Sequence, residues 1–126
     1  MTPSLTRQEL RIMSVVWSRD GATGREVCDA LSEEKPVAYT TVVTLMNILA
    51  GKGHLTREAE GRQFRYRPKV SQKRALSTLV RDFVDRVFAG SPESLMAHLI
   101  DETRVSPEEI RELLKQSKAR KGKDRA

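Results

Sequence analysis

One face of an expected helix over residues 39–52 carries short hydrogen-bonding side chains. Thr40, Thr44 and Asn47 follow one another at spacings of four and three residues, so an α-helix places them on the same side. Threonine hydroxyls bond to phosphates or base edges, and an asparagine carboxamide forms a bidentate pair with adenine. This chemistry predicts contact with duplex DNA. The predicted contacts of this helix are Tyr39, Thr40, Thr41, Thr44 and Asn47.

The opposite side of the same helix is apolar and is expected to face a core. Its apolar residues are Val42, Leu45, Met46 and Leu49. Tyr39, at the helix start, fits either a DNA contact or a core position. Gly53 is expected to end the helix. The segment 54–68 then predicts two short strands around a turn at Gly61 and Arg62.

The second strand of this expected hairpin alternates aromatic and cationic residues. Phe64 and Tyr66 alternate with Arg65 and Arg67, which predicts an apolar, core-facing side and a cationic side. Arg62 at the turn and Arg65 on the outer side are predicted to contact flanking phosphates or a minor groove. Such contacts add affinity without sequence information and weaken steeply with salt. A threonine or arginine face alone is usually a solvated surface, but the succession of helix-turn-helix and basic hairpin favours DNA.

Two capping boxes define the helices that precede this unit. Thr6 with Glu9 and Thr23 with Glu26 are spaced so that each pair satisfies its own free backbone N–H groups. The two helices are expected over 7–18 and 24–32. Trp17 is expected in the core, and Cys28 is interpreted as a small buried residue rather than a reactive thiol.

Three amphipathic helices are expected after Ser71, and their apolar stripes are wide for a segment of this size. A core of that size is marginal alone, so a second copy of the chain is expected to cover the stripes. The predicted dimerisation residues are Leu76, Leu79, Val80, Phe83, Val84, Val87, Leu95, Leu99, Ile110 and Leu113. A basic disordered tail is expected over 119–126.

Composition limits the classes of function that fit the chain. Its 126 residues carry a net charge of +6 with a pI near 9.8, which favours a polyanionic partner. The single cysteine excludes an internal disulfide, and no apolar run of membrane-spanning length or signal peptide is recognisable. No catalytic, cofactor or metal motif appears around His54 or His98. We therefore expect a cytoplasmic protein that is not an enzyme and has no cofactor, metal site or membrane partner.

Several segments together carry a family resemblance. They are LTRQELRIMSVVW at 5–17, AYTTVVTLM at 38–46, KG at 52–53 and GRQFRYRP at 61–68. The chain from about residue 5 to 105 resembles the penicillinase-repressor family of beta-lactamase and methicillin-resistance repressors. The resemblance implies a winged-helix domain, a helical dimerisation domain and a palindromic operator. It also implies DNA contacts at Thr40, Thr41 and Thr44.

The resemblance carries further expectations about this chain. Val43 and Ile48 stand where relatives often have Lys or Arg, which shifts phosphate contacts towards the wing. In some systems such repressors are released when a sensor-linked membrane peptidase cuts the dimerisation domain. The corresponding bond here joins His98 and Leu99. The cysteine cluster of the copper-responsive branch is absent.

The sequence thus predicts a mainly α protein with a small β-hairpin. It would comprise a winged helix-turn-helix over 1–70, a helical dimerisation domain over 71–118 and the tail. The predicted function is a homodimeric transcriptional repressor that binds double-stranded DNA at an inverted-repeat operator, with proteolytic release as a possible step. The alternative is a winged-helix module that binds another protein and has no sequence-specific affinity for DNA.

Overall fold

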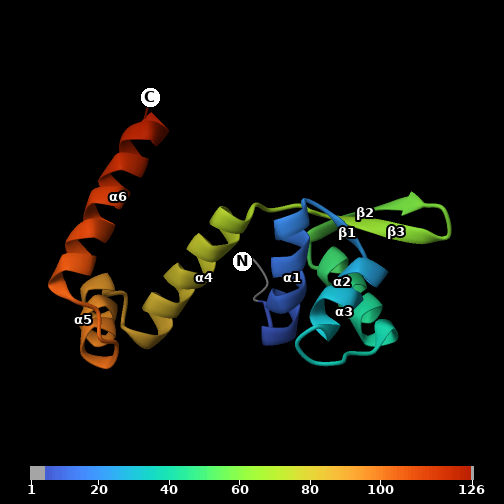
Figure 1. The fold of residues 1–126 in the computed structure, drawn as a ribbon, viewed down its shortest axis with the longest axis horizontal. Coiled ribbons are helices and arrows are strands. Elements are labelled where there is room, and N and C mark those ends of the chain that lie inside the picture. The colour runs from blue at the N-terminus through green and yellow to red at the C-terminus, as the bar shows by residue number, and fades with distance from the viewer. Residues whose placement is uncertain (1–4, 126) are drawn as a thin grey trace. The chain divides into compact units, whose positions relative to one another are not determined.

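The computed structural model describes residues 5–125, which form six helices and three strands (Figure 1). The elements are α1 (Arg7–Arg19), β1 (Ala22–Thr23), α2 (Gly24–Ser32), α3 (Tyr39–Gly51), β2 (Leu55–Glu60), β3 (Gln63–Pro68), α4 (Gln72–Val87), α5 (Pro92–Glu102) and α6 (Pro107–Arg125). The mainly helical class with a small antiparallel sheet is as the sequence predicts. None of the helices in the described part combines the length and apolar character needed to cross a bilayer.

Both capping boxes form as predicted and start the first two helices. Thr6 Oγ1 accepts from the Glu9 backbone N–H at 3.1 Å, and Glu9 Oε1 accepts from the Thr6 N–H at 2.8 Å. Thr23 and Glu26 repeat the exchange at 3.2 and 3.4 Å. Each cap of this kind stabilises a helix start by about 1 kcal/mol. The first helix ends at Asp20, which adopts the left-handed conformation.

The core of the first compact unit, which extends to Val80, lies between α1, α2, α3 and the sheet. Its fully buried side chains include Ile12, Met13, Val16, Val27, Val42, Met46 and Leu49. Cys28 is buried among them, as predicted. Trp17 is half-buried against this core, and its indole N–H donates to the Val70 carbonyl at 3.0 Å. The apolar side of α3 therefore faces inward, which leaves its polar side outward.

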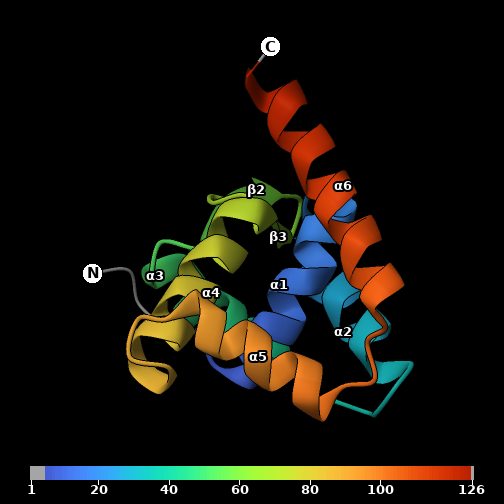
Figure 2. The same cartoon turned by 90° about the vertical axis from the view of Figure 1, so that its left-hand side faces the viewer.

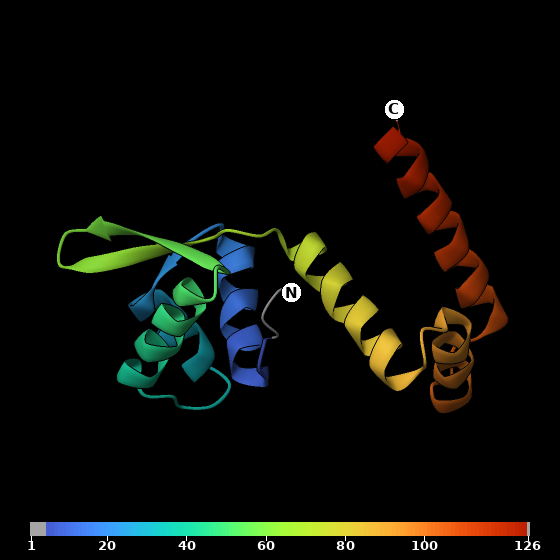
Figure 3. The ribbon, with the colours of Figure 1, turned by 180° about the vertical axis from the view of Figure 1, so that it is seen from behind.

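The sheet has the order β1-β3-β2 and is antiparallel throughout. Strand β1 has two residues and was not predicted, because a segment this short shows no periodicity. The wing is the β2–β3 hairpin, turned at Gly61 with φ of +63°, and it extends past α2 and α3 (Figure 3). Tyr66 is 2% exposed, but Phe64 is 42% exposed. The prediction of a core position for Phe64 is wrong, because it lies near the tip, beyond the part that the helices cover.

The second compact unit begins at Arg81 and contains the end of α4 with α5 and α6. The sequence predicts a boundary at residue 70, but the first turns of α4 cluster with the first unit, where Ala75 is buried. Ser91 and Ser106 cap α5 and α6 by accepting N–H bonds at 3.1 Å. Figure 2 shows α6 leaving the end of α5 through a short connection. α6 continues to Arg125 in place of the expected disordered tail, since lysine and arginine sustain a helix already begun.

Candidate nucleic-acid interface

The outward side of α3 presents a narrow row of small polar groups. Thr40, Thr41, Thr44 and Asn47 are all exposed. Thr44 Oγ1 donates to the Thr40 carbonyl at 2.8 Å, so its proton is used within the helix and its lone pairs remain outward. Short side chains allow the helix axis to come close to a groove floor. The structure thus places four of the predicted contacts on one accessible surface.

The start of α3 lies very close to α2 because Gly24 has no side chain. A Cβ atom at Gly24 would stand 2.9 Å from Val43 Cγ2, closer than real Cβ contacts. Tyr39 is 38% exposed and lies at the surface rather than in the core. The Arg25 guanidinium lies 4.4 Å from the centre of the Tyr39 ring. Arg25 thus joins the helix-turn-helix surface, although no local pattern in the sequence marks it.

Asn47 is engaged by the wing. Its Oδ1 accepts from Tyr66 Oη at 2.8 Å and from Arg57 Nη1 at 2.9 Å. A bidentate pair with adenine needs this oxygen to accept from the base amino group. In this arrangement two protein donors already occupy it. The side chain that the sequence predicts as a base contact therefore joins α3 to the hairpin.

Arg57 belongs to the same cluster, and the sequence does not predict it as a site residue. Its guanidinium lies 4.7 Å from the centre of the exposed Phe64 ring. Within the described residues, no carboxylate lies within ion-pair distance of it. A single arginine in a predicted strand does not indicate that it belongs to this surface, because its contact with Asn47 depends on how the hairpin packs beside α3.

The outer side of the wing carries paired charges. Arg65 Nε donates to Glu60 Oε2 at 2.6 Å, and its Nη2 lies 3.1 Å from Glu26 Oε1. The hydrogen bond from Arg65 holds the pKa of Glu60 below its ordinary value, and the same bond raises the pKa of Arg65. Arg67 pairs with Glu58 at 3.0 Å. The predicted cationic side is therefore largely neutralised, because the register places Glu60 diagonally across from Arg65 and Glu58 diagonally across from Arg67.

Arg62 remains exposed at the hairpin turn, as predicted, and has no ion pair among the residues described. Three cations on this surface, Arg25, Arg57 and Arg62, thus have no carboxylate within ion-pair distance in the described part of the chain. Arg25 and Arg57 lie beside α3, through Tyr39 and Asn47, and Arg62 lies at the turn of the wing. Such an arrangement favours a polyanion.

An ion pair with a buried carboxylate fixes the far end of α3. Lys52 Nζ, at the C-cap, lies 2.8 and 2.9 Å from the two carboxylate oxygens of Glu9, whose side chain is 2% exposed. Burial raises the pKa of Glu9, but hydrogen bonds from Lys52 and Thr6 outweigh it and hold the pKa below its ordinary value. The end of α3 is thereby tied to the beginning of α1.

Three packed helices, a small sheet and a projecting hairpin define a winged-helix domain. The family described as Penicillinase repressor matches residues 5–119, and the chain belongs to this family. The penicillinase repressor of Bacillus licheniformis is 30% identical over 111 residues, which cover 88% of this chain and 87% of that protein.

Solved structures support the same assignment of the fold. The solution structure of the DNA-binding domain of the repressor BlaI has a TM-score of 0.52 and 30% identity, and the match covers 57% of this chain and 88% of that one. B. licheniformis BlaI, solved as a monomer in complex with the blaP half-operator, has a TM-score of 0.50 and 30% identity over 58% of this chain and 89% of that one.

Proposed function

We propose that this chain is a transcriptional repressor that binds duplex DNA with α3 and the wing. The observation that carries the proposal is the exposed threonine row of α3, with Arg25 and Arg57 beside it, which no carboxylate among the described residues neutralises. The net charge of +6 favours the same partner. The BlaI structure with its half-operator provides a precedent within the family.

In this proposal α3 enters the major groove. Thr40 and Thr41 lie in its first turn, where free N–H groups and the helix dipole favour a phosphate. Thr44, one turn further, contacts base edges through its oxygen and methyl group. Arg62 reaches the adjacent backbone from the hairpin turn. Val43 and Ile48 supply no charge to α3, so the cationic contacts with the backbone fall to the wing.

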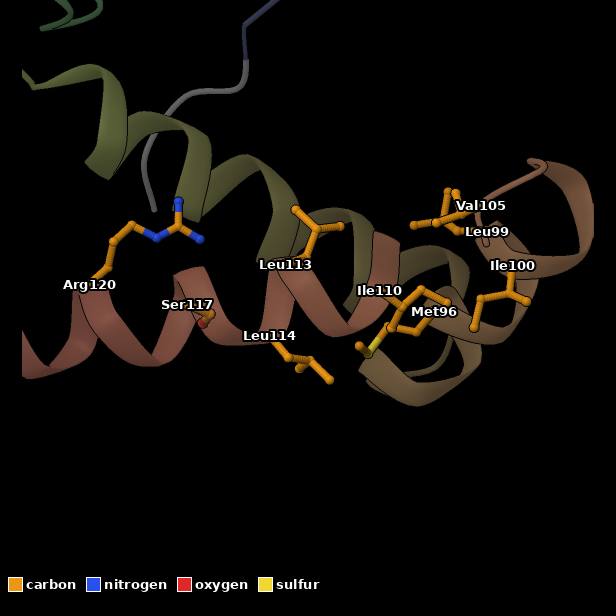
Figure 4. A pocket seen from close by; sticks show the side chains of 9 residues that line it. All are labelled: Met96, Leu99, Ile100, Val105, Ile110, Leu113, Leu114, Ser117 and Arg120. Atoms are coloured by element: carbon orange, nitrogen blue, oxygen red, sulfur yellow. The ribbon is translucent and has the colours of Figure 1, made fainter. Parts of the chain in front are cut away.

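We also propose that a second copy of the chain packs on the C-terminal helices. Several large apolar side chains of α4 to α6 are exposed, and an open apolar pocket of about 380 Å³ lies between α5 and α6 (Figure 4). The proposed dimer contacts are Leu76, Leu79, Val80, Phe83, Val87, Leu95, Leu99, Ile110 and Leu113. Val84 is already buried within its own chain and leaves little surface for a partner. Exposed apolar surface of this kind is typical of an interface.

Two-fold symmetry would present two copies of α3 to successive major grooves. The proposed operator is therefore an inverted repeat, with half-site centres about 10 bp apart or a multiple of it.

The proposal includes release by cleavage between His98 and Leu99, brought about by a sensor-linked protease. Both residues are exposed, but they lie within α5, so the helix must open locally before the bond can enter an active site. Intact-mass spectrometry of the protein from induced cells would detect two fragments that meet at this bond. A full-length chain released from DNA under induction would contradict this step.

The test of DNA binding is sequencing of genomic fragments retained by the purified protein at two salt concentrations. We expect retained fragments to share an inverted repeat, and retention to fall steeply with salt. Sedimentation velocity on the same sample should give a dimer. A winged-helix module that binds proteins would instead retain no DNA and would bind its partner in a salt-tolerant manner.

A further inference from the structure

We propose that Arg57 is the residue of the wing strands that contacts the DNA backbone, beside Arg62 at the turn, and that Asn47 is a positioning residue that directs Arg57. This inference rests on the proposed DNA binding and names the residues that perform one part of it. It replaces Arg65 as the principal backbone contact of the strands, and it replaces base recognition by Asn47.

The two sides of the wing differ in how far their cations are neutralised. Arg65 bonds to Glu60 and Glu26, and Arg67 bonds to Glu58. A phosphate that approached them would meet these carboxylates and would have to displace them. Arg57 has no carboxylate within ion-pair distance among the residues described, so its charge is available to an anion.

The register of the hairpin determines which side of the wing carries Arg57. Arg57 is paired with Tyr66, whose side chain is buried towards the core, and alternation places Arg65 on the opposite side of β3. The Arg57 side chain therefore lies on the side of the wing that faces α3, as its bond to Asn47 requires. A duplex held by α3 would have its backbone beside this side of the wing.

Arg57 is held in place in the absence of DNA. Its guanidinium lies over the Phe64 ring at 4.7 Å and donates one bond to Asn47. A guanidinium has five N–H donors, so others remain for a phosphate. The aromatic contact also accounts for a large apolar side chain exposed near the tip of the wing. Holding a long side chain in advance lowers the entropy lost on binding.

Asn47 acts through Arg57 in this arrangement. Its Oδ1 accepts from Arg57 and from Tyr66, and this bond network connects α3 to both strands of the wing. Loss of the carboxamide should therefore weaken binding to all sequences by a similar factor. A residue that recognised adenine would instead change the preferred sequence.

The test uses a fluorescein-labelled duplex of mixed sequence, about 30 bp or three helical turns long. Fluorescence anisotropy across a series of NaCl concentrations gives the slope of log affinity against log salt. Arg57→Ala should make this slope shallower by about 0.9 for each bound subunit. The matched control, Arg65→Ala, removes the same side chain from the other side of the wing and should leave the slope unchanged. Thermal melting of each variant verifies that it is folded.

Two further variants separate charge from position. Arg57→Lys keeps the charge but loses the stacking of the planar guanidinium on Phe64. Its salt slope should therefore equal that of the parent, while its affinity for the duplex falls. Asn47→Ala should reduce affinity roughly three- to tenfold with the slope retained. Selection from a random-sequence duplex pool should return the same preferred bases for Asn47→Ala and the parent.

Three results would overturn the inference. They are an unchanged slope in Arg57→Ala, a shallower slope in Arg65→Ala alone, or altered base preference in Asn47→Ala. If the parent binds the duplex and Arg57→Ala has the same salt slope as the parent, only this inference fails. If the parent itself ignores duplex at low salt, the proposed function fails and the inference falls with it.

Discussion

Replacing Glu9 by glutamine tests how the end of α3 is fixed. The carboxamide oxygen of the introduced glutamine can still accept from the Thr6 N–H, so the capping box is preserved while the carboxylate that binds Lys52 is lost. A hydrogen bond to a charged group contributes about 1.5–3 kcal/mol. Because the Lys52 side chain is 28% exposed and stays solvated, we expect a loss near the lower end, about 2 kcal/mol.

The assay is denaturation followed by Trp17 fluorescence, since the single tryptophan lies in the first unit. A loss of about 2 kcal/mol lowers the Tm of a domain this size by roughly 8–16 °C. The matched control is Glu34→Gln. Glu34 pairs with Arg11 at 3.6 Å but has an 82% exposed side chain, and an exposed pair of this kind contributes about 0–1 kcal/mol.

The pH dependence provides a second readout with a definite sign. The pKa of Glu9 is lowered in the folded state, so the unfolded chain binds its proton first as the pH falls. The stabilisation is therefore complete above the ordinary carboxyl range, about pH 4–5, and is lost as the pH falls through the lower folded pKa. The stability gap between parent and Glu9→Gln should shrink in acid.

Either of two outcomes would refute this reasoning. One is a Glu9→Gln protein as stable as the parent at pH 7. The other is a gap that stays constant as the pH falls to about 3, below the ordinary carboxyl range. With a constant gap, the contribution of the Glu9 side chain to stability would come from packing and not from its charge.

Three other substitutions have expected outcomes. Gly24→Ala places a Cβ atom 2.9 Å from Val43 Cγ2, so it should destabilise the first unit by about 1–3 kcal/mol in thermal melts and weaken retention on DNA. Leu113→Glu adds a charge to the proposed dimer surface and should shift sedimentation towards monomer, whereas Glu112→Gln should not. Trp17→Phe removes the 3.0 Å bond to the Val70 carbonyl and should lower stability by about 1 kcal/mol in urea denaturation followed by circular dichroism.

The parts of the fold that the sequence predicted depend on local interactions. The capping boxes at Thr6 and Thr23 join residues three apart, and the apolar spacing of α3 follows the helix period. Their geometry is determined by neighbours in the chain, so it needs no knowledge of the tertiary structure. The winged-helix class follows from the succession of these elements.

The parts that were missed depend on pairings between distant residues. The neutralisation of Arg65 requires the β2–β3 register and the position of Glu26, which lies 39 residues away along the chain. The exposure of Phe64 depends on how far the hairpin extends past the helices. Asn47 shows the same limitation, because its exposed helix position was predicted but its partners Arg57 and Tyr66 were not.

The order of the sheet leaves β2 as an outer strand whose backbone is open along one margin. Exposed strands of this kind can pair with a strand of another molecule and begin aggregation. Arg57, Glu58 and Glu60 place charges along β2, and another strand added at this margin would have to accommodate them. The charged side chains of β2 thus disfavour the pairing of this strand with β2 of another copy of the chain, in addition to their roles within the wing.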